Sequence, residues 1–310
     1  MRRLWVVPLL LLQTPLLAQD YTERLESLVT KLSPSIVTVK AVLRTETKFT
    51  GESQAQESRL NMTGVSVSDD GLVMVSNTAF SPMRAMEMMG MPGDVQGEMG
   101  MKTTPTSIKV VYGNEETEYD AFLAATDTNL DLAFVKVEGL GERKVPFVDF
   151  GAGTDAIVAQ RVVQVNRLGR GYDYAPYFQT ALVNGEISTP RKAWLLEGSI
   201  STFGLPVFAL GGEVIGVLTT IPSGIKEPGS AEGFSFSMFM RLLGGGGGTT
   251  GTSFVLPAAV VKGIVEQAKV RAVEVAAQRA KKRKEPAKPP AQPSKPATKP
   301  QTKPPAKPGK

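Results

Sequence analysis

The sequence predicts an all-β protein with one helix near its C-terminus, and three features lead to this prediction. Short runs rich in β-branched residues recur along residues 34–220, and Gly- and Asn-containing turn signals separate them. Apolar residues recur at helical spacing after Pro257. Residues 285–310 are so rich in Lys and Pro that they cannot bury a core. Many short strands at this spacing are typical of β-barrels or a β-sandwich.

Each strand is expected where β-branched and apolar residues cluster between turns. The expected strands are 34–44, 65–68, 72–75, 108–112, 121–125, 133–137, 162–165, 178–188, 207–210 and 214–220. Asp69-Asp70-Gly71 indicates a tight turn between the second and third of these. The helix is expected to open at Pro257, a favoured first position, and to bury a face formed by Val261, Ile264, Val265 and Ala268.

The composition excludes several kinds of chemistry. The chain of 310 residues can hold one or two domains, and its 42% hydrophobic content is ordinary for a globular protein. It contains no cysteine and no histidine. Disulfides, thiol chemistry and His/Cys zinc sites are therefore excluded, and so is any catalytic triad that uses an imidazole as general base. We expect no cofactor.

The N-terminus resembles an export signal. Met1-Arg2-Arg3 is followed by an apolar stretch over residues 4–12 and by a small residue, Ala18, before a plausible cut. The alternative is a membrane anchor, but the apolar run is shorter than the ~20 residues of a membrane-spanning helix and is broken by proline. We therefore expect an exported, periplasmic or extracytoplasmic protein whose mature chain has no transmembrane span.

Charge is divided unevenly along the chain. Residues 279–310 carry eleven Lys or Arg residues and one acid, Glu285, which gives +10, while Arg2 and Arg3 add +2. Because the whole chain is +5, residues 19–278 carry −7. The basic tail is either a solvated spacer or a means of binding an anionic envelope surface. Nucleic acid is not the expected partner, since the tail has no aromatic residue from Gln278 onward for stacking on bases.

Four segments in register resemble the HtrA/Deg type of trypsin-like serine protease. Residues 63–80 are similar to the family's "SGVIISEDGYIVTNNHVV", and residues 107–137 to its "IKV…D…TDLAVLKI". Residues 201–216 stand where the family has "GNSGGP…GEVIG", and residues 253–257 resemble "GFAIP". The resemblance implies two six-stranded antiparallel β-barrels, split near Val145-Pro146. It does not extend to a PDZ domain.

The expected organisation follows from this resemblance. It comprises a signal peptide at 1–18, an N-terminal barrel at 19–145 with a Met-rich loop at 81–101, a C-terminal barrel at 146–256, a helix at 257–284 and a disordered tail at 285–310.

The resemblance also maps the catalytic positions of the family onto this chain. The family histidine falls on Thr78, the aspartate on Asp131, the serine on Phe203 and the oxyanion-hole glycine on Ser201. The base and the nucleophile are both replaced, and an orienting carboxylate has nothing to orient without an imidazole. The sequence thus indicates a pseudoprotease that binds a protein through the former cleft or the Met-rich loop.

Two alternatives remain open from the sequence. A serine activated by lysine could use Ser199 or Ser201 with Lys192. The Met-rich loop could hold Cu(I), because thioethers are soft ligands, or it could contact a partner or simply cover the barrel. The candidate sulfur ligands are Met83, Met86, Met88, Met89 and Met91.

Overall fold

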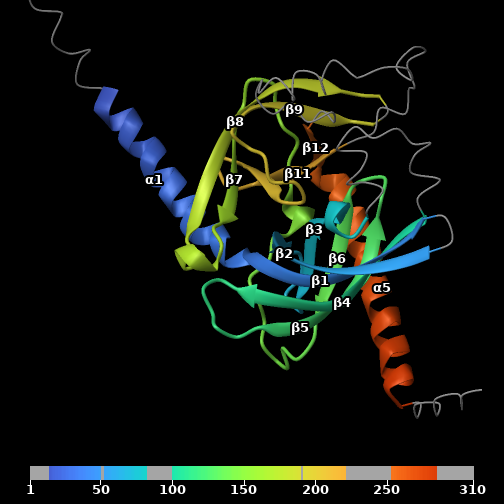
Figure 1. The fold of residues 1–310 in the computed structure, drawn as a ribbon. Helices are drawn as coiled ribbons and strands as arrows, with labels where there is room; N and C mark the ends of the chain where they lie inside the picture. Colours follow the sequence, from blue (N-terminus) through green and yellow to red (C-terminus); the bar gives the residue numbers. More distant parts are fainter. Residues whose placement is uncertain (1–13, 50–51, 82–99, 190, 221–252, 285–310) are drawn as a thin grey trace, which may run out of the picture.

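The computed structural model describes residues 14–49, 52–81, 100–189, 191–220 and 253–284. The described chain forms two closed six-stranded antiparallel β-barrels, which confirms the predicted fold class (Figure 1). Residues 82–99 of the Met-rich loop predicted at 81–101 lie outside the described residues, as does the tail at 285–310, so the five candidate copper ligands do too. Residues 100 and 101, placed in the loop by the prediction, begin a strand.

The first barrel contains the strands that the sequence places before residue 138. Its strands are β1 (Ile36–Phe49), β2 (Glu52–Ser66), β3 (Leu72–Ser76), β4 (Gly100–Tyr112), β5 (Tyr119–Asp127) and β6 (Leu132–Val137). They close in the order β1-β2-β3-β6-β5-β4. Alternating valines such as Val37, Val39, Val73 and Val75 fill the interior, and each is fully buried. The two-residue period of the sequence therefore sets which side chains face the barrel core.

The second barrel follows the same plan. Its strands are β7 (Arg161–Arg167), β8 (Pro176–Ile187), β9 (Ala193–Gly198), β10 (Pro206–Ala209), β11 (Val214–Thr220) and β12 (Ser253–Pro257). They close in the order β10-β11-β12-β9-β8-β7. Trp194 on β9 is fully buried in this barrel. Strand β9 was not predicted; its run Ala193-Trp194-Leu195-Leu196 contains no β-branched residue.

Two long helices flank the barrels on opposite sides of Figure 1: α1 (Thr14–Leu32) and α5 (Ala258–Lys284). Helix α5 begins one residue after the expected start, because Pro257 ends β12. Its predicted face is buried through Val261, Val265 and Ala268, with Ile264 partly buried. Helix α1 was not predicted, although Leu25, Leu28 and Leu32 lie three and four residues apart. No helix in the described part of the chain is long and apolar enough to cross a membrane.

Arg167 joins the second barrel to the segment that leads from α1 into β1. This segment is a short 3₁₀ helix, η1 (Ser33–Ser35). The guanidinium donates to the carbonyl of Ser33 from Nε at 3.1 Å and Nη2 at 2.7 Å, and to that of Ile36 from Nε at 2.9 Å. Nη1 donates to the carbonyl of Tyr174 at 2.9 Å. Burial lowers the pKa of Arg167, yet the group remains a cation because it starts far above neutrality.

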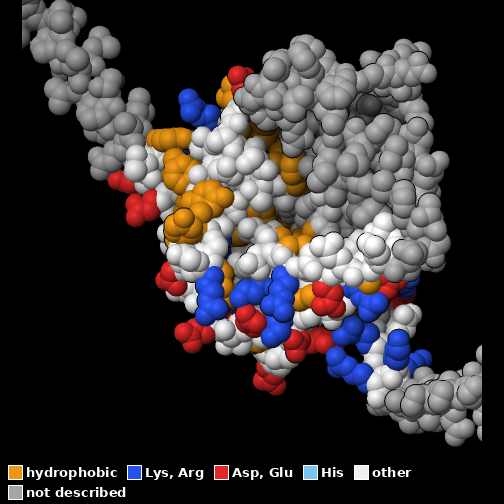
Figure 2. Space-filling view, in the orientation of Figure 1, with side chains coloured by type: hydrophobic (Ala, Val, Ile, Leu, Met, Phe, Trp, Pro, Cys, Tyr) orange, Lys and Arg blue, Asp and Glu red, His pale blue; other side chains and the backbone are white. Residues whose placement is uncertain are grey.

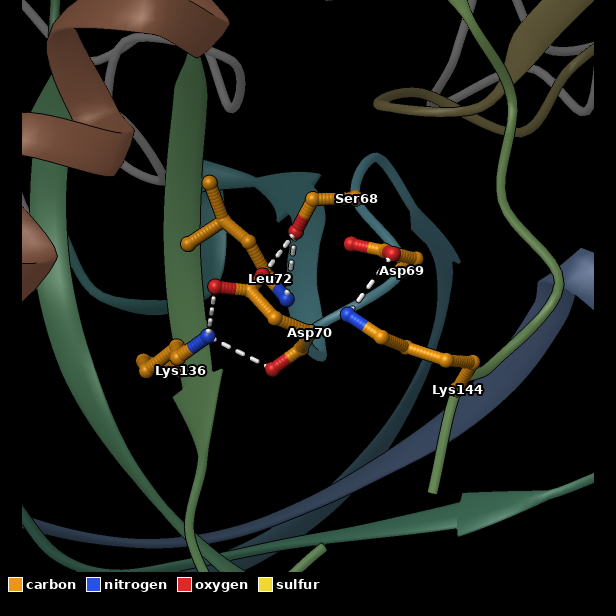
Figure 3. Close-up of polar contacts among 6 residues, drawn as sticks. All are labelled: Ser68, Asp69, Asp70, Leu72, Lys136 and Lys144. Atoms are coloured by element: carbon orange, nitrogen blue, oxygen red, sulfur yellow. Dashed lines mark hydrogen bonds and ion pairs between the residues drawn. The ribbon is translucent and has the colours of Figure 1, made fainter. Parts of the chain in front are cut away.

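The turn between β2 and β3 is fixed by two lysines (Figure 3). Lys136 Nζ donates to the backbone carbonyl of Asp70 at 2.6 Å and pairs with its carboxylate at 2.8 Å. Lys144 Nζ pairs with Asp69 at 2.9 Å. Burial alone would raise the pKa of Asp70, but the hydrogen bonds from Lys136 and Ser68 hold it below its usual value. The turn predicted from Asp69-Asp70-Gly71 is confirmed, with Gly71 at φ 83°.

The outer faces of the two barrels differ in character. Figure 2 shows Lys, Arg, Asp and Glu side chains gathered over the first barrel, and apolar side chains exposed over the second. Exposed apolar residues on or beside β7 and β8 include Leu168, Tyr172, Phe178 and Leu182.

Candidate functional site

Asp131 lies on the turn between β5 and β6 and has no solvent exposure. Its backbone has φ 54°, in the left-handed region that aspartate and asparagine tolerate better than most residues. Asn77 donates its backbone N–H to the carbonyl of Asp131 at 3.0 Å, which fixes the turn against the end of β3. A buried carboxylate is costly unless hydrogen-bond donors surround it.

Hydroxyl groups from Ser76 and Thr78 provide those donors. Ser76 Oγ donates to Asp131 Oδ2 at 2.8 Å, and Thr78 Oγ1 lies 3.0 Å from each carboxylate oxygen. Ser76 Oγ and Thr78 Oγ1 are also 3.0 Å apart. Both residues belong to the short segment at the start of η2 (Asn77–Ala79), where Ser76 also caps the backbone N–H of Thr78 at 3.3 Å. The carboxylate is thus directed at position 78, where threonine stands.

The segment that carries Phe203 comes from the second barrel and lies against Ser76. Gly204 has φ 79°, and a Cβ atom there would collide with the backbone nitrogen of Ser76. The ring of Phe203 is partly buried and packs on the apolar core of the second barrel. Because Gly204 touches Ser76, the structure brings the Phe203 segment next to the Ser76–Thr78–Asp131 cluster. It therefore places three of the four mapped catalytic positions at one junction between the barrels.

Ser201, the fourth mapped position, is exposed at the edge of this segment. Gln179 Nε2 on β8 donates to Ser201 Oγ at 3.2 Å and to the carbonyl of Ser199 at 2.6 Å. Ser199 Oγ donates to the carbonyl of Thr180 at 3.1 Å. Both serine hydroxyls are therefore engaged with β8.

Lys192 does not activate either serine. Its Nζ pairs with Asp155 at 2.6 Å and lies 5.3 Å from the centre of the Trp194 ring. The hydrogen bond that Lys192 donates to Asp155 raises the pKa of Lys192, whereas a lysine that acts as a general base needs a lowered pKa. The serine–lysine dyad considered from the sequence therefore finds no support in this geometry.

Two buried amides that the sequence analysis did not single out hold the Phe203 segment in place. Gln164 and Asn166, both on β7, are almost fully buried. Gln164 donates to the carbonyl of Thr202 at 3.0 Å and accepts from its N–H at 3.2 Å. Asn166 Nδ2 donates to Thr202 Oγ1 at 2.6 Å. The sequence does carry a signal for them. Residues 162–166 read Val-Val-Gln-Val-Asn, so two side-chain amides occur within a strongly apolar strand and need hydrogen-bond partners when that strand is buried.

The described residues offer no cluster of three or more His, Cys, Asp or Glu side chains that could bind a metal ion. The carboxylate of Asp131 has neighbours that are hydroxyl donors, which is the arrangement of a satisfied buried acid.

Comparison with known proteins gives sequence similarity over part of the chain. No protein-family model matches it. A "Probable periplasmic serine endoprotease DegP-like" from Rhizobium meliloti (strain 1021) is 31% identical over 157 residues, 49% of this chain and 27% of the relative. A protein of the same description from Bartonella henselae is 30% identical over 174 residues, 52% of this chain and 28% of the relative. The chain thus spans little more than a quarter of these relatives.

Among solved structures, the chain is similar to one described as "Crystal structure of Deg5". The two superimpose with a TM-score of 0.44 at 20% identity, over 64% of this chain and 86% of that chain. Over about half of its length the chain is therefore homologous to DegP-like serine endoproteases, and it has the two six-stranded barrels of the trypsin-like, HtrA-type fold.

Proposed function

We propose that this chain is a non-catalytic member of the HtrA/DegP-type proteases that binds a protein partner in the cell envelope. The observation that carries the proposal is the environment of Asp131. Its carboxylate accepts hydrogen bonds from Ser76 and Thr78, and Thr78 stands where the family has histidine. With no histidine in the chain, no imidazole can take a proton from a nucleophile.

The nucleophile position supports the same conclusion. Phe203 carries no group that can attack a carbonyl, and its partly buried ring packs against the core of the second barrel. Gln164 and Asn166 hold the neighbouring Thr202 through three hydrogen bonds. These contacts stabilise the segment in its present form, so it is a rigid surface at the junction of the barrels. A rigid surface suits binding, since less conformational entropy is lost when a partner docks.

Export to the periplasm or another extracytoplasmic compartment is part of the proposal. It is supported by the signal-like residues 1–18 and by the word "periplasmic" in the descriptions of both relatives. The C-terminal end of α5 also supports contact with an anionic envelope surface. Lys281 and Lys282 are exposed there, and Arg279 and Arg283 lie 3.7 and 3.2 Å from Glu138. One acid therefore faces several cations, which leaves this end of the helix positively charged.

Two measurements test the absence of catalysis and the presence of binding. The purified chain should not hydrolyse casein and should not be labelled by a fluorophosphonate above the level of a Phe203→Ala variant. Capture experiments from envelope extract should recover a protein with the wild-type chain. A Phe203→Asp variant should reduce that recovery, because a charge would alter the junction surface. Labelling of the wild type above the Phe203→Ala control would overturn the proposal.

A further inference from the structure

The outer edge of β2 is a long strand edge with no neighbour among the described residues. Strand β1 pairs with β2 along its full length, from Ile36↔Val65 to Phe49↔Glu52. On its other side, β2 pairs with β3 at Val65 and Ser66. Residues 54–59 are all exposed, and β1 and β2 run together out of the barrel in Figure 1. Strand edges of this length present unpaired backbone N–H and C=O groups that can pair with another chain.

The direction of these backbone groups follows from the pairing at the barrel end. Val67 donates its N–H to the carbonyl of Leu72 at 2.8 Å, on the side of β3. Backbone groups alternate in direction along a strand, and the register between β1 and β2 is unbroken. Odd-numbered residues of β2 therefore direct N–H and C=O toward the outer edge, and even-numbered residues direct theirs toward β1.

Strands β2, β1 and β4 form a three-stranded ribbon, and its opposite edge, on β4, is not equally suited to pairing. Strand β4 lies on the other side of β1 and carries Pro105, which has no N–H to donate. Its register with β1 shifts between Val42 and Leu43, which marks a bulge. Residues 52–66 of β2 contain no proline, and their register with β1 has no shift. The β2 edge is thus the continuous one.

We propose that the β2 edge binds the β2 edge of a second copy of this chain, antiparallel and centred on Ser58. In this register Glu57 of each copy lies opposite Arg59 of the other, so the two-fold axis generates two pairs of opposite charges. Both side chains are exposed, and no ion pair involving either is present within the described residues. Opposite charges directly across two strands are stabilising, and like charges are destabilising.

The same register also pairs the backbone N–H and C=O groups of the two β2 edges. Residues 57 and 59 are odd-numbered, so each Glu57–Arg59 pair exchanges two N–H···O=C bonds across the interface. Ala55 lies opposite Asn61 and exchanges two more in each half. Ser58, which directs its backbone toward β1, forms a non-hydrogen-bonded pair with its own copy on the axis. The interface is isologous, because the same patch contributes from both copies.

Charge reversal tests the register. We expect Glu57→Arg and Arg59→Glu each to weaken self-association about tenfold, because each variant places like charges opposite one another. An equimolar mixture of the two variants should restore it, since arginines of one then face glutamates of the other. Sedimentation velocity measures the association, and circular dichroism checks that each variant is folded. If the mixture associates no better than the separate variants, the proposed register is wrong.

A cysteine pair provides an independent test of geometry. The chain has no cysteine, so Ser58→Cys introduces a single thiol. Cα atoms of a non-hydrogen-bonded pair are about 4.5 Å apart, within disulfide range. Gln54→Cys is the matched control, because the two copies of residue 54 would be separated by eight residues of strand, roughly 26 Å.

We expect Ser58→Cys to form a disulfide-linked dimer on mild oxidation, and Gln54→Cys to form no disulfide-linked dimer under the same conditions. Equal cross-linking of the two variants would overturn the proposal. So would protection of the odd-numbered amides 55–61 from hydrogen exchange in a protein that sediments as a monomer, because another segment of the same chain would then cover the edge.

Discussion

Thr219 on β11 donates its hydroxyl to the backbone carbonyl of Leu130, with an Oγ1···O distance of 2.5 Å. Leu130 precedes Asp131, and both Thr219 and Leu130 are buried. This hydrogen bond therefore ties the turn that presents Asp131 to the second barrel. It contributes to holding a left-handed aspartate in place at the junction between the barrels.

Asp131 is expected to be a structural residue. Replacing it with alanine removes the carboxylate that accepts from the hydroxyls of Ser76 and Thr78, and alanine tolerates φ 54° less well than aspartate does. We expect Asp131→Ala to lower the free energy of unfolding by about 1–3 kcal/mol from the lost hydrogen bonds. Asp131→Asn should cost less, because asparagine tolerates left-handed backbone and retains an acceptor. Urea denaturation measures both, and equal losses would contradict this account.

The proposed non-catalytic function predicts that a serine nucleophile alone will not give activity. Phe203→Ser alone should leave fluorophosphonate labelling at background, because no base is present and the members of a triad act as a unit. The triple variant Thr78→His, Ser201→Gly, Phe203→Ser should be labelled, since Asp131 is already directed at position 78. Labelling of the single variant would show that another group acts as the base. A folded triple variant without labelling would show that Phe203 is not at the nucleophile position.

Arg167 is expected to anchor the segment between α1 and β1. Its guanidinium spans the carbonyls of Ser33, Ile36 and Tyr174, which the single ammonium group of lysine cannot reach together. Arg167→Lys should therefore destabilise the protein by about 2 kcal/mol and increase hydrogen exchange near residues 33–37. Arg161→Lys, at the exposed start of the same strand, is the control. Unchanged exchange in Arg167→Lys would mean that the carbonyls find other donors.

Alkaline pH should destabilise the first barrel through Tyr112. Burial raises the pKa of Tyr112 to about 12, and the nearby Arg143 cation opposes the shift. In the unfolded chain a tyrosine ionises near its ordinary pKa of about 10. Between these values the unfolded state binds fewer protons, so this contribution to stability is complete below pH ~10 and falls as pH rises toward ~12. Denaturation of the wild type and of Tyr112→Phe across that range measures how far the free energy of unfolding falls with pH. The fall should be smaller in the variant.

The basic tail should bind anionic surfaces without contributing to the fold. Residues 285–310 contain no aromatic residue and many lysines and prolines, so they have charge but little means of packing. Deleting them should leave the melting temperature unchanged and should weaken binding to anionic phospholipid vesicles. Binding of the full chain should also weaken as salt rises, because ionic screening shortens the reach of exposed charges. A lower melting temperature after deletion would show that the tail packs on residues 19–278, which carry a net negative charge.

Most of the strands and the C-terminal helix could be predicted from local patterns of residues. Runs of β-branched or apolar residues overlap ten of the twelve strands, although the expected strand 65–68 covers only the last two residues of β2. Residues 253–257, which resemble the family's "GFAIP", form β12. Helix α5 was found within one residue, since helical periodicity is a local property. The missed elements have weaker local signals. Strand β9 lacks β-branched residues, and α1 begins inside a segment that reads as an export signal.

The candidate site divides in the same way. The sequence by itself determined that these 310 residues cannot form a triad with an imidazole base, because they contain no histidine, and it identified Thr78, Asp131, Phe203 and Ser201 as positions to examine. The tertiary structure decided what surrounds Asp131. Ser76, Gln164 and Asn166 contribute through contacts across turns and between strands that lie far apart in the chain. The reason is physical: a buried polar group takes whatever partner the packed fold brings within about 3 Å, and sequence spacing does not specify that partner.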